Sequence, residues 1–361
     1  MIPSADSLPG MEHSLGGLRK CRSVVSVDIW NGLDEVPSDL QGSVVTIGVF
    51  DGVHRGHQTL IDTAVTKARE LGVPAVMMTF DPHPSVIFLP KSVPPLLATV
   101  EQRAVSAARY GIDAMLVVAF DDEIISWSPE EYFRRVIVDL FKAKAVVVGD
   151  NFTFGSQASG TSATMKELGK RYGVDVTVHG LLRDGDGVDG TDGHTVCSSW
   201  IRQQLAAGNV AGAAGALGRN FTVRGVVTRG AGRGGAALGF PTANLYFPDS
   251  QALPADGVYA GDLRILPTQK DPVGALVGDM PVDVHLPAAI SVGTNPTFGD
   301  ETRSVEAFVL DHEADLYGRK VTVSFVDHIR GMENYDGLDE LVEAIGNDVE
   351  ATRRLVPRER G

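Results

Sequence analysis

The sequence predicts two folds in series: an α/β domain built on a parallel sheet, followed by a small antiparallel β-barrel with a terminal helix. Three observations support this prediction. Strand-like and helix-like segments alternate up to about residue 205, short strands between Gly- and Pro-rich loops follow from about residue 220, and an amphipathic segment closes the chain. Alternation of strand and helix is typical of a doubly wound parallel sheet, whereas evenly spaced short strands are typical of barrels and sandwiches.

The α/β half begins with residues 44–50, a β-branched apolar run typical of a buried parallel strand. Residues 57–71 then repeat apolar side chains at helical spacing and end before Gly72. The remaining predicted elements of this half are a helix at 129–141 and strands at 75–80, 115–120, 145–148 and 174–178.

The second half contains shorter runs of strand-forming residues. Strands are predicted at 222–228, 257–265, 288–292, 304–310 and 320–328, and a helix at 338–355. An Ala- and Gly-rich segment joins the halves, so we predict a disordered extension over 1–24, a first domain over 25–205, a linker helix over 206–219 and a second domain over 220–361. Translation could start at Met1 or at Met11, and the sequence does not decide between them.

Composition narrows the classes of function. The formal net charge of −14 argues against a nucleic-acid or membrane binder, because either would need a basic face. The chain has two cysteines, which favours a reducing compartment, and we expect a cytoplasmic protein. It has no run of about 18 apolar residues of the kind that spans a membrane. We therefore expect small-molecule substrates, and the sequence leaves a homo-oligomer open.

A phosphate site is predicted where the first strand meets the first helix. The strand ending at Phe50 runs into a loop, 51–57, that contains His54, Gly56 and His57. A helix N-terminus has unpaired N–H groups and attracts phosphate, two histidines one turn apart could both face it, and glycine would allow close approach. A plain turn is the simpler alternative, and zinc is less favoured because no further ligands lie nearby in sequence.

A second site is predicted in the barrel half. Residues 230–235 form a glycine-rich loop with one cation, and Thr242 and Asn244 follow shortly after it. A hydroxyl and an amide oxygen are hard ligands that suit Mg²⁺ together with nucleotide phosphates. Read alone, Pro-Thr-Ala-Asn is equally consistent with a structural turn.

The first half resembles the nucleotidylyltransferase superfamily in its FMN-adenylyltransferase form. The resemblance rests on GVFDGVHRGHQ (48–58), TFDPHP (79–84), GDNFTFG (149–155) and SSWIR (198–202), although Ser199 stands where threonine is usual. It implies a Rossmann-like domain with catalytic His54, His57 and Arg202. The resemblance further implies ATP and phosphate contacts at Gly48, Phe50, Asp51, Gly56, Ser198 and Ser199, and flavin contacts at Asp81, Asn151 and Phe154.

The second half resembles riboflavin kinases. The matching segments are the GxGRxxxxxGFPTAN pattern (230–244), SVGTNPTFG (291–299), SVEAF (304–308) and RGMENY (330–335). The resemblance implies that Glu306 is the base that deprotonates the ribityl 5′-hydroxyl and that Thr242 and Asn244 hold Mg²⁺. It also implies phosphate contacts at Gly232 and Arg233 and a flavin contact at Arg330. The apolar neighbours of Glu306 predict a raised pKa, and a surface carboxylate on an edge strand is the alternative.

Both motif sets together identify the chain as a member of the bacterial bifunctional riboflavin kinase/FMN adenylyltransferase family. The resemblance covers about residues 27–356. It implies that ATP phosphorylates riboflavin to FMN and then adenylylates FMN to FAD with release of pyrophosphate. Three alternatives are an enzyme with one inactive module, a flavin-storage protein without catalysis, and a nucleotidylyltransferase with another acceptor. The intact motifs disfavour the first, and the kinase-like half has no place in the last.

Overall fold

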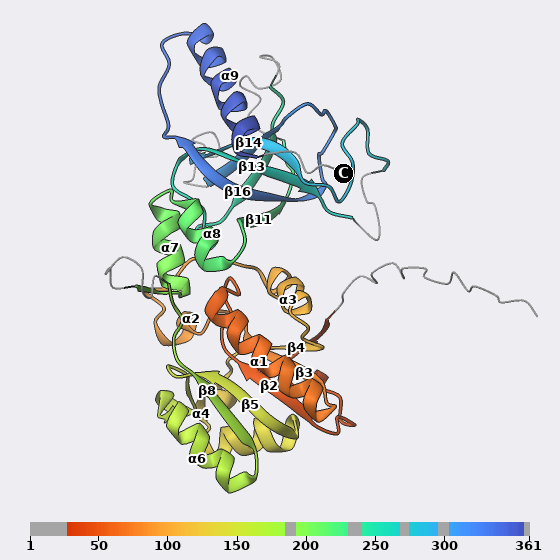
Figure 1. Ribbon diagram of the computed structural model, residues 1–361, viewed down its shortest axis with the longest axis vertical. Helices are drawn as coiled ribbons and strands as arrows, with labels where there is room; N and C mark the ends of the chain where they lie inside the picture. The colour runs from red at the N-terminus through yellow and green to blue at the C-terminus, as the bar shows by residue number, and fades with distance from the viewer. Residues whose placement is uncertain (1–26, 185–192, 230–239, 268–273, 295–302, 357–361) are drawn as a thin grey trace, which may run out of the picture.

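The computed structural model describes residues 27–184, 193–229, 240–267, 274–294 and 303–356. The described residues form two units stacked along the long axis of the molecule, with two helices between them (Figure 1). The predicted extension at 1–24 and two predicted phosphate contacts, Gly232 and Arg233, lie outside the described residues.

The first unit is built on a parallel sheet, as the alternation of strands and helices predicts. Its six described strands lie in the order β1-β4-β3-β2-β5-β8, and every neighbouring pair is parallel. The strands are β1 (Asp28–Asn31), β2 (Ser43–Ile47), β3 (Ala75–Phe80), β4 (Ala114–Val118), β5 (Ala143–Gly149) and β8 (Asp175–His179). Because β2, β3, β4 and β5 are buried almost throughout, the sheet is covered on both faces.

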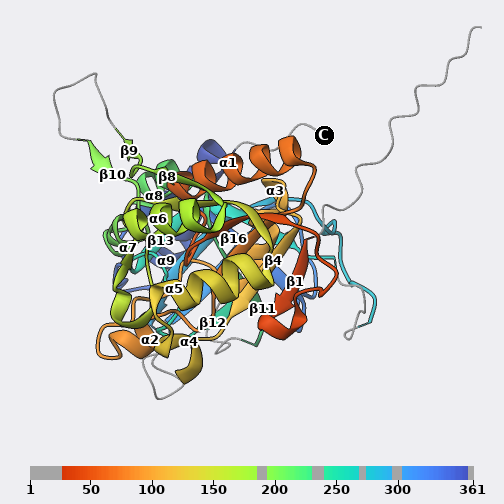
Figure 2. The same cartoon turned by 90° about the horizontal axis from the view of Figure 1, so that it is seen from below.

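Helices supply the two covering layers. One apolar cluster joins the sheet to α1 (Arg55–Leu71) and α3 (Val100–Arg109), and another joins it to the 129–140 segment and α6 (Ser162–Tyr172). The shorter elements are η1 (Leu33–Glu35), α2 (Ser85–Phe88), α4 (Asp122–Ser126), β6 (Thr153–Phe154), η3 (Ser156–Ala158) and β7 (Gly160–Thr161). The hairpin of β9 (Arg183–Asp184) and β10 (His194–Thr195) projects from the body of the molecule (Figure 2).

The second unit is a strongly curved antiparallel sheet. Its described strands follow the order β11-β16-β13-β14-β15-β12, and a bridge between Thr228 and Asn244 brings the two ends of this order together. The strands are β11 (Phe221–Val226), β12 (Ala243–Phe247), β13 (Gly257–Ile265), β14 (Leu286–Thr294), β15 (Arg303–Val309) and β16 (Lys320–Arg330). The terminal helix α9 (Leu338–Leu355) packs against β13, β14 and β16. The predicted fold class, an α/β domain followed by a barrel with a terminal helix, is confirmed.

Two helices lie between the units. They are α7 (Ser198–Ala206) and α8 (Val210–Leu217), and their buried side chains Ile201, Leu205 and Val210 belong to the same apolar cluster as the barrel interior. A strand-like contact, Leu96 with Gln251, also links the units directly. The helices therefore pack as part of the barrel core, although the Ala- and Gly-rich sequence indicated only a linker.

Several elements were not predicted from the sequence, among them β1, α3, α6, α7 and β12. β1 carries the polar residues Asp28 and Asn31 on a largely exposed sheet edge, so it lacks an apolar run. α3 begins with a capping box between Thr99 and Gln102, which is a local signal for a helix start. β12 contains Asn244, which we read as part of a ligand-binding turn. The predicted 129–141 helix is also divided: α5 (Pro129–Tyr132) continues as the π-helical segment η2 (Phe133–Leu140).

Candidate active sites

The first site forms at the carboxyl end of β2, where the 48–54 loop enters α1. His54 is the N-cap of the helix, and its Nδ1 accepts the backbone N–H of His57 at 3.3 Å. The two imidazole rings stack with centroids 3.6 Å apart, and Phe50 lies edge-on to His57 at 5.0 Å. The predicted pair of histidines is thus a single rigid unit at the helix N-terminus.

Both histidines are held in the neutral form. Burial, followed by the charges of Arg219 and Arg202, lowers the pKa of His54 to about 4. Burial and the neighbouring His54 lower the pKa of His57 well below its usual value. Because Nδ1 of His54 accepts a hydrogen bond, its proton is assigned to Nε2. Nδ1 of His57 is buried without a hydrogen-bond partner in the described structure, which leaves it available to a ligand.

Gly56 is required by its neighbours. A Cβ atom at this position would lie 3.2 Å from the His54 ring and 3.3 Å from the carbonyl oxygen of Val196. Any other residue would displace the imidazole that caps the helix. We expected this glycine to let a triphosphate approach the backbone, and the structure adds that it admits the histidine ring. At Gly48, also a predicted contact, a Cβ atom would lie 3.4 Å from the Phe50 ring.

Asp51 is a buried connector. Its carboxylate accepts the backbone N–H groups of Leu97 and Ala98 and forms an ion pair with Arg202. Arg202 also donates from Nε to the carbonyl oxygen of Pro95 at 2.7 Å. These bonds fix the guanidinium beside the 48–54 loop. In this structure the role of Asp51 is therefore to position Arg202.

The N-terminus of α7 closes the same loop. Ser198 Oγ donates to the carbonyl oxygen of Asp51 at 2.9 Å, and Ser199, which follows it, is exposed. The SSWIR segment therefore meets the histidine loop although more than 140 positions separate them in sequence.

The predicted flavin residues are placed differently from one another. Asp81 and Asn151 are exposed beyond the ends of β3 and β5, and Asp81 lies 3.5 Å from the guanidinium of Arg103. Phe154, in contrast, is buried in the core, with its ring against Phe152 and Tyr132. The structure therefore does not bring Phe154 to the surface that Asp81 and Asn151 share.

An aromatic group was missed in the sequence reading. Phe120, just after β4, stacks on Phe80 at 4.6 Å and meets Phe88 of α2 at 5.6 Å. Half of the Phe88 side chain is exposed, which is unusual for phenylalanine. These rings lie at the carboxyl edge of the parallel sheet, where such sheets bind ligands. The signal available in the sequence was a phenylalanine as the last residue of each of two predicted strands, 75–80 and 115–120.

The second site lies between three neighbouring strands of the barrel. Glu306 on β15 stands opposite Asn244 on β12 and opposite Ser291 on β14. Asn244 is buried, and its amide donates to the backbone and hydroxyl oxygens of Thr242 at 3.0 and 3.3 Å. The structure thus brings together the three predicted residues Thr242, Asn244 and Glu306.

Glu306 is partly buried. Burial raises the pKa of its carboxyl above the usual value, which suits a general base. β15 pairs with β14 on one side and β12 on the other, so the alternative of an edge-strand surface carboxylate is wrong.

A small cavity adjoins this group. It measures about 210 Å³ and is lined by Pro241, Thr242, Leu316 and Tyr317 among others. The guanidinium of Arg229 lies over the Tyr317 ring, 5.6 Å from its centroid. The cavity places an aromatic side chain next to the predicted Mg²⁺ ligands.

The described residues suit a hard cation. The side-chain oxygens of Thr242 and Asn244 are of the type that Mg²⁺ prefers, and a nucleotide phosphate would complete the ligand set. Among the described residues no group of three His, Cys, Asp or Glu side chains could hold a metal by itself. Arg330, a predicted flavin contact, donates two hydrogen bonds to Asp348, which ties β16 to α9.

Comparison with known proteins identifies both halves. The family model described as FAD synthetase matches residues 36–188, and the one described as riboflavin kinase matches residues 217–356. The bifunctional riboflavin kinase/FMN adenylyltransferase of Escherichia coli K12 is 32% identical over 88% of this chain and 93% of its own. The chain belongs to the bifunctional riboflavin kinase/FMN adenylyltransferase family. It covers most of the length of another member, from Pseudomonas fluorescens, at 33% identity over 90% of this chain and 96% of that one.

A solved structure shares the whole architecture. It is titled a macrolide-efflux protein from Streptococcus pneumoniae, is 30% identical, covers 91% of this chain and 100% of its own, and has a TM-score of 0.77. Its title differs from the names of the family members, but its full coverage supports the two-domain fold. Among the helices that the structure describes, none has the length and apolar character needed to cross a membrane.

Membership of the flavin-synthesising family assigns the two domains. The parallel-sheet domain is the FMN adenylyltransferase, and the barrel is the riboflavin kinase. The chain is therefore an enzyme that uses ATP, with riboflavin, FMN and FAD as its substrates and products. This excludes the alternatives of a storage protein and of a different phosphate acceptor.

Proposed function

We propose that the two sites described above carry the two reactions in sequence, with the roles that follow. The observation that carries the proposal is that each half gathers its reactive side chains from distant segments. In the barrel, β12 and β15 place Asn244 opposite Glu306. In the α/β domain, the histidine pair, Asp51 and Arg202 meet at one helix N-terminus.

In the kinase reaction, the Glu306 carboxylate accepts the proton of the ribityl 5′-hydroxyl. The oxygen then forms a bond to the γ-phosphorus of ATP, the bond to the bridging oxygen breaks, and ADP leaves. Thr242 and Asn244 would hold Mg²⁺, which neutralises phosphate charge when bound. Gly232 and Arg233, which lie outside the described residues, remain our proposed contacts to the phosphates.

In the adenylyl transfer, a phosphate oxygen of FMN attacks the α-phosphorus of ATP in line and pyrophosphate leaves. No covalent protein intermediate is needed, so positioning and electrostatic stabilisation supply the catalysis. His54 and His57 are neutral and act as hydrogen-bond donors, and Arg202 supplies the positive charge. Ser198 and Ser199 stand at the α7 N-terminus beside them, where N–H groups favour phosphate.

The flavin contacts are proposed with different roles. Asp81 and Asn151 would touch the flavin directly, because they are exposed at the carboxyl edge of the sheet. Phe154 would support that edge from within the core. Arg330 would contact the flavin from the barrel side, and its ion pair with Asp348 holds the guanidinium against α9.

We further propose a cytoplasmic location, supported by the two-cysteine composition, and we retain 25–205, 206–219 and 220–361 as the domain division. Because α7 and α8 pack into the barrel core, a barrel fragment should begin before Val196 so that it keeps the buried side chains of both helices. A homo-oligomer stays open and is tested by light scattering of the purified protein.

The decisive experiment incubates purified protein with riboflavin, ATP and Mg²⁺ and separates the flavins by chromatography. FMN should appear first and FAD later, and FAD should form from added FMN without riboflavin. Omitting Mg²⁺ should stop both reactions. Accumulation of FMN with no FAD would show that the adenylyl-transfer site is assigned wrongly, and absence of FMN would show the same for the kinase site.

A further inference from the structure

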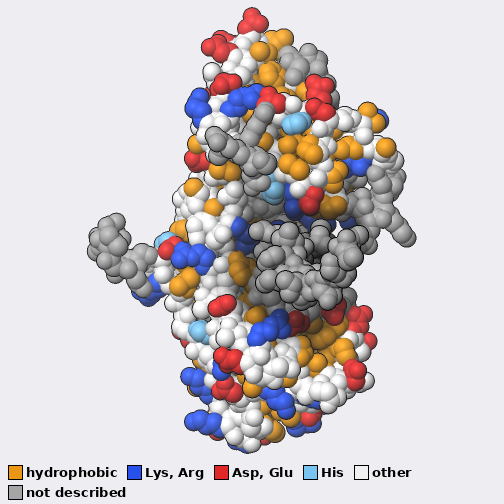
Figure 3. All heavy atoms as spheres, turned by 45° about the vertical axis from the view of Figure 1, so that its right-hand side comes forward, with side chains coloured by type: hydrophobic (Ala, Val, Ile, Leu, Met, Phe, Trp, Pro, Cys, Tyr) orange, Lys and Arg blue, Asp and Glu red, His pale blue; other side chains and the backbone are white. Residues whose placement is uncertain are grey.

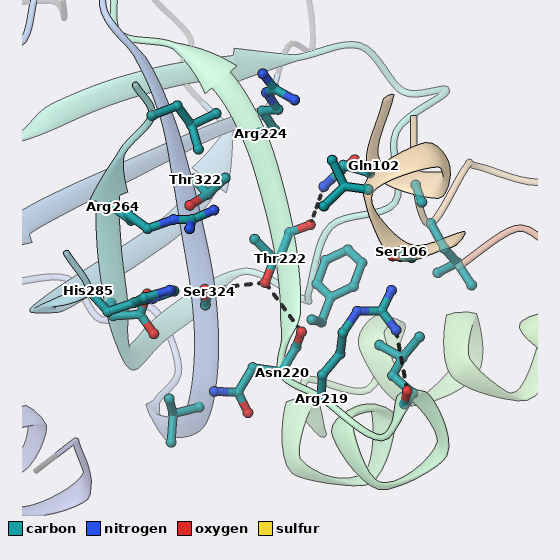
Figure 4. Close-up of a pocket in the computed structure, with 18 of the residues that line it drawn as sticks. Gln102, Ser106, Arg219, Asn220, Thr222, Arg224, Arg264, His285, Thr322 and Ser324 are labelled. Atoms are coloured by element: carbon teal, nitrogen blue, oxygen red, sulfur yellow. Dashed lines mark hydrogen bonds and ion pairs between the residues drawn. The ribbon is translucent and has the colours of Figure 1, made fainter. Parts of the chain in front are cut away.

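The lining of a cavity between the two domains contains none of the catalytic residues proposed above. The cavity measures about 550 Å³ and is bounded by α3 of the first domain, by the segment that joins α8 to β11, and by the outer faces of β11, β13 and β16. Figure 4 shows Arg264 and His285 on one side, Gln102 and Ser106 of α3 on the other, and Thr322 and Ser324 between them. Its volume is that of a pocket for a small organic ligand.

The outer face of the barrel is polar here but shielded from water. Along β16, Val321, Val323 and Phe325 point into the barrel core, so the intervening Thr322 and Ser324 point out. An outward face should be solvated, yet Thr322 is only 7% exposed and Ser324 4%. Arg224 of β11 and Arg264 of β13 flank Thr322 on the neighbouring strands, and Gln102 of α3 bonds directly to the β11 backbone.

Two buried polar atoms in the cavity lack partners. Thr322 Oγ1 and Arg264 Nε make no hydrogen bond in the described structure. Buried polar groups are normally paired, because an unpaired one costs on the order of 1–3 kcal/mol. The Thr322 hydroxyl can donate or accept a hydrogen bond, and Arg264 Nε is a donor on a cationic group. An anionic ligand in the cavity would supply the missing partner to both.

The charge of the cavity points the same way. Among the described residues that line it are four arginines, Arg109, Arg219, Arg224 and Arg264, but a single carboxylate, Asp262, which is bound to His285. This is a local excess of positive charge in a chain whose net charge is −14. Figure 3 shows Lys and Arg side chains at the waist between the domains, and both basic and acidic side chains over the two ends.

The four arginines differ in how many of their N–H donors are already bound within the protein. Arg219 already donates to the carbonyl oxygens of Gly52 and Leu217, and Arg264 binds exposed Asp283 through one terminal nitrogen. Arg109 and Arg224 form no hydrogen bond or ion pair with any described residue; Glu101 is the nearby acid that feels the charge of Arg224. Free donors therefore come from Arg109, Arg224 and Nε of Arg264.

We propose that this interdomain cavity binds a phosphate monoester that carries an apolar or aromatic group. A phosphate monoester has close to two negative charges at neutral pH and oxygens that arginine binds well. Its organic part would lie against the apolar part of the lining, which includes Val105, Leu266 and Leu355. The inference does not depend on the roles proposed for either active site. FMN and adenosine monophosphate share this chemistry, and the experiment separates them.

The test measures binding of phenyl phosphate to the full-length protein by calorimetry. Arg224→Ala combined with Arg264→Ala should weaken binding about 10-fold or more, because charge-assisted hydrogen bonds are lost. Arg134→Ala combined with Arg171→Ala is the matched control, since both are exposed arginines paired with carboxylates elsewhere in the first domain. The control should bind like wild type, and both double variants should keep both enzymatic turnover rates at saturating substrate.

Thr322→Val gives a test that does not disturb folding. It keeps the shape, removes the unpartnered hydroxyl, and should leave thermal stability unchanged or higher while weakening phenyl phosphate binding about 3- to 10-fold. FMN and adenosine monophosphate are then compared in the same variants, and the one that loses affinity in parallel is the ligand type. Unchanged phenyl phosphate binding in both the double variant and Thr322→Val would overturn the proposal. If inorganic phosphate bound with the same affinity as phenyl phosphate, the proposed contact with an apolar or aromatic group would be wrong.

Discussion

The two active sites prepare for phosphate chemistry in opposite ways. In the adenylyltransferase domain, burial keeps bases uncharged: His54 and His57 are neutral, and the fixed cation is Arg202. In the kinase domain, burial acts on an acid and raises the pKa of Glu306, which makes the carboxylate a better proton acceptor. The comparison teaches that one physical cause, desolvation, serves electrostatic positioning in one domain and proton transfer in the other.

The comparison predicts its largest effect at Glu306. Glu306→Gln keeps the shape and removes the base, so kinase turnover should fall about 10²–10⁴-fold, while substrate KM values change much less. In the wild type, kinase turnover should fall on acidification with a midpoint above that of an ordinary glutamate, because the base must be ionised. The measurement is FMN formation from riboflavin across pH.

Glu343→Gln, an exposed carboxylate on α9, is the control and should be silent. FAD formation from added FMN should continue in the Glu306 variant. If the variant forms FMN at a rate within a few-fold of wild type, Glu306 is not the base. Desolvation would then not serve proton transfer in the kinase domain.

The next effect is expected in the other domain. His57→Ala removes a neutral donor at the α1 N-terminus, so the rate of FAD formation from FMN should fall about 10²–10³-fold. Kinase turnover should be unchanged. The two rates are measured separately by chromatography of the flavins.

His179→Ala serves as the matched control, because His179 lies on β8 and bonds to Thr63, away from the histidine pair. A normal rate of FAD formation in His57→Ala would mean that the stacked pair is structural only. The proposal that neutral histidines stabilise the phosphates would then be wrong.

A smaller effect is expected at the ion pair between Asp51 and Arg202. Arg202→Lys keeps the charge but loses the fixed geometry, because lysine cannot bond Asp51 and the Pro95 carbonyl oxygen in the same fork arrangement. FAD formation should fall about 10-fold through its turnover rate, as expected when a positioned charge is displaced. Asp51→Asn should give a similar fall. Full activity in both variants would show that Arg202 needs no positioning.

The smallest effect concerns stability. The pKa of His54 is about 4 in the fold against 6.5 for the free side chain, so the unfolded state binds more protons between these values. Stability from neutral His54 is present above pH 6.5 and is lost as the pH falls toward 4. Between pH 7.5 and 5 the loss is about 2 kcal/mol by proton linkage.

Urea unfolding of the wild type and of His54→Asn checks this. Asparagine retains an N-cap without titrating, so the variant should lose less stability on acidification. An equal loss in both proteins would assign the acid sensitivity to other groups, such as His57.

Much of the fold could be read from local patterns. The strands at 75–80 and 257–265 and the helix at 338–355 begin and end where the sequence predicts. Periodicity encodes such elements because each residue's neighbours in the chain are also its neighbours in the element. The edge strand β1 has no such pattern, and β12 was hidden because its asparagine resembles a turn residue.

The sequence by itself determined the order of the two folds, the family, and which residue types stand in each motif. Only the tertiary structure decided what those residues touch. The ion pair between Asp51 and Arg202 joins residues 151 positions apart, and Arg330 was found bound to Asp348. The cavity between α3 and the barrel likewise exists only where two domains meet. Local patterns cannot specify such contacts, because they depend on how separate elements pack in space.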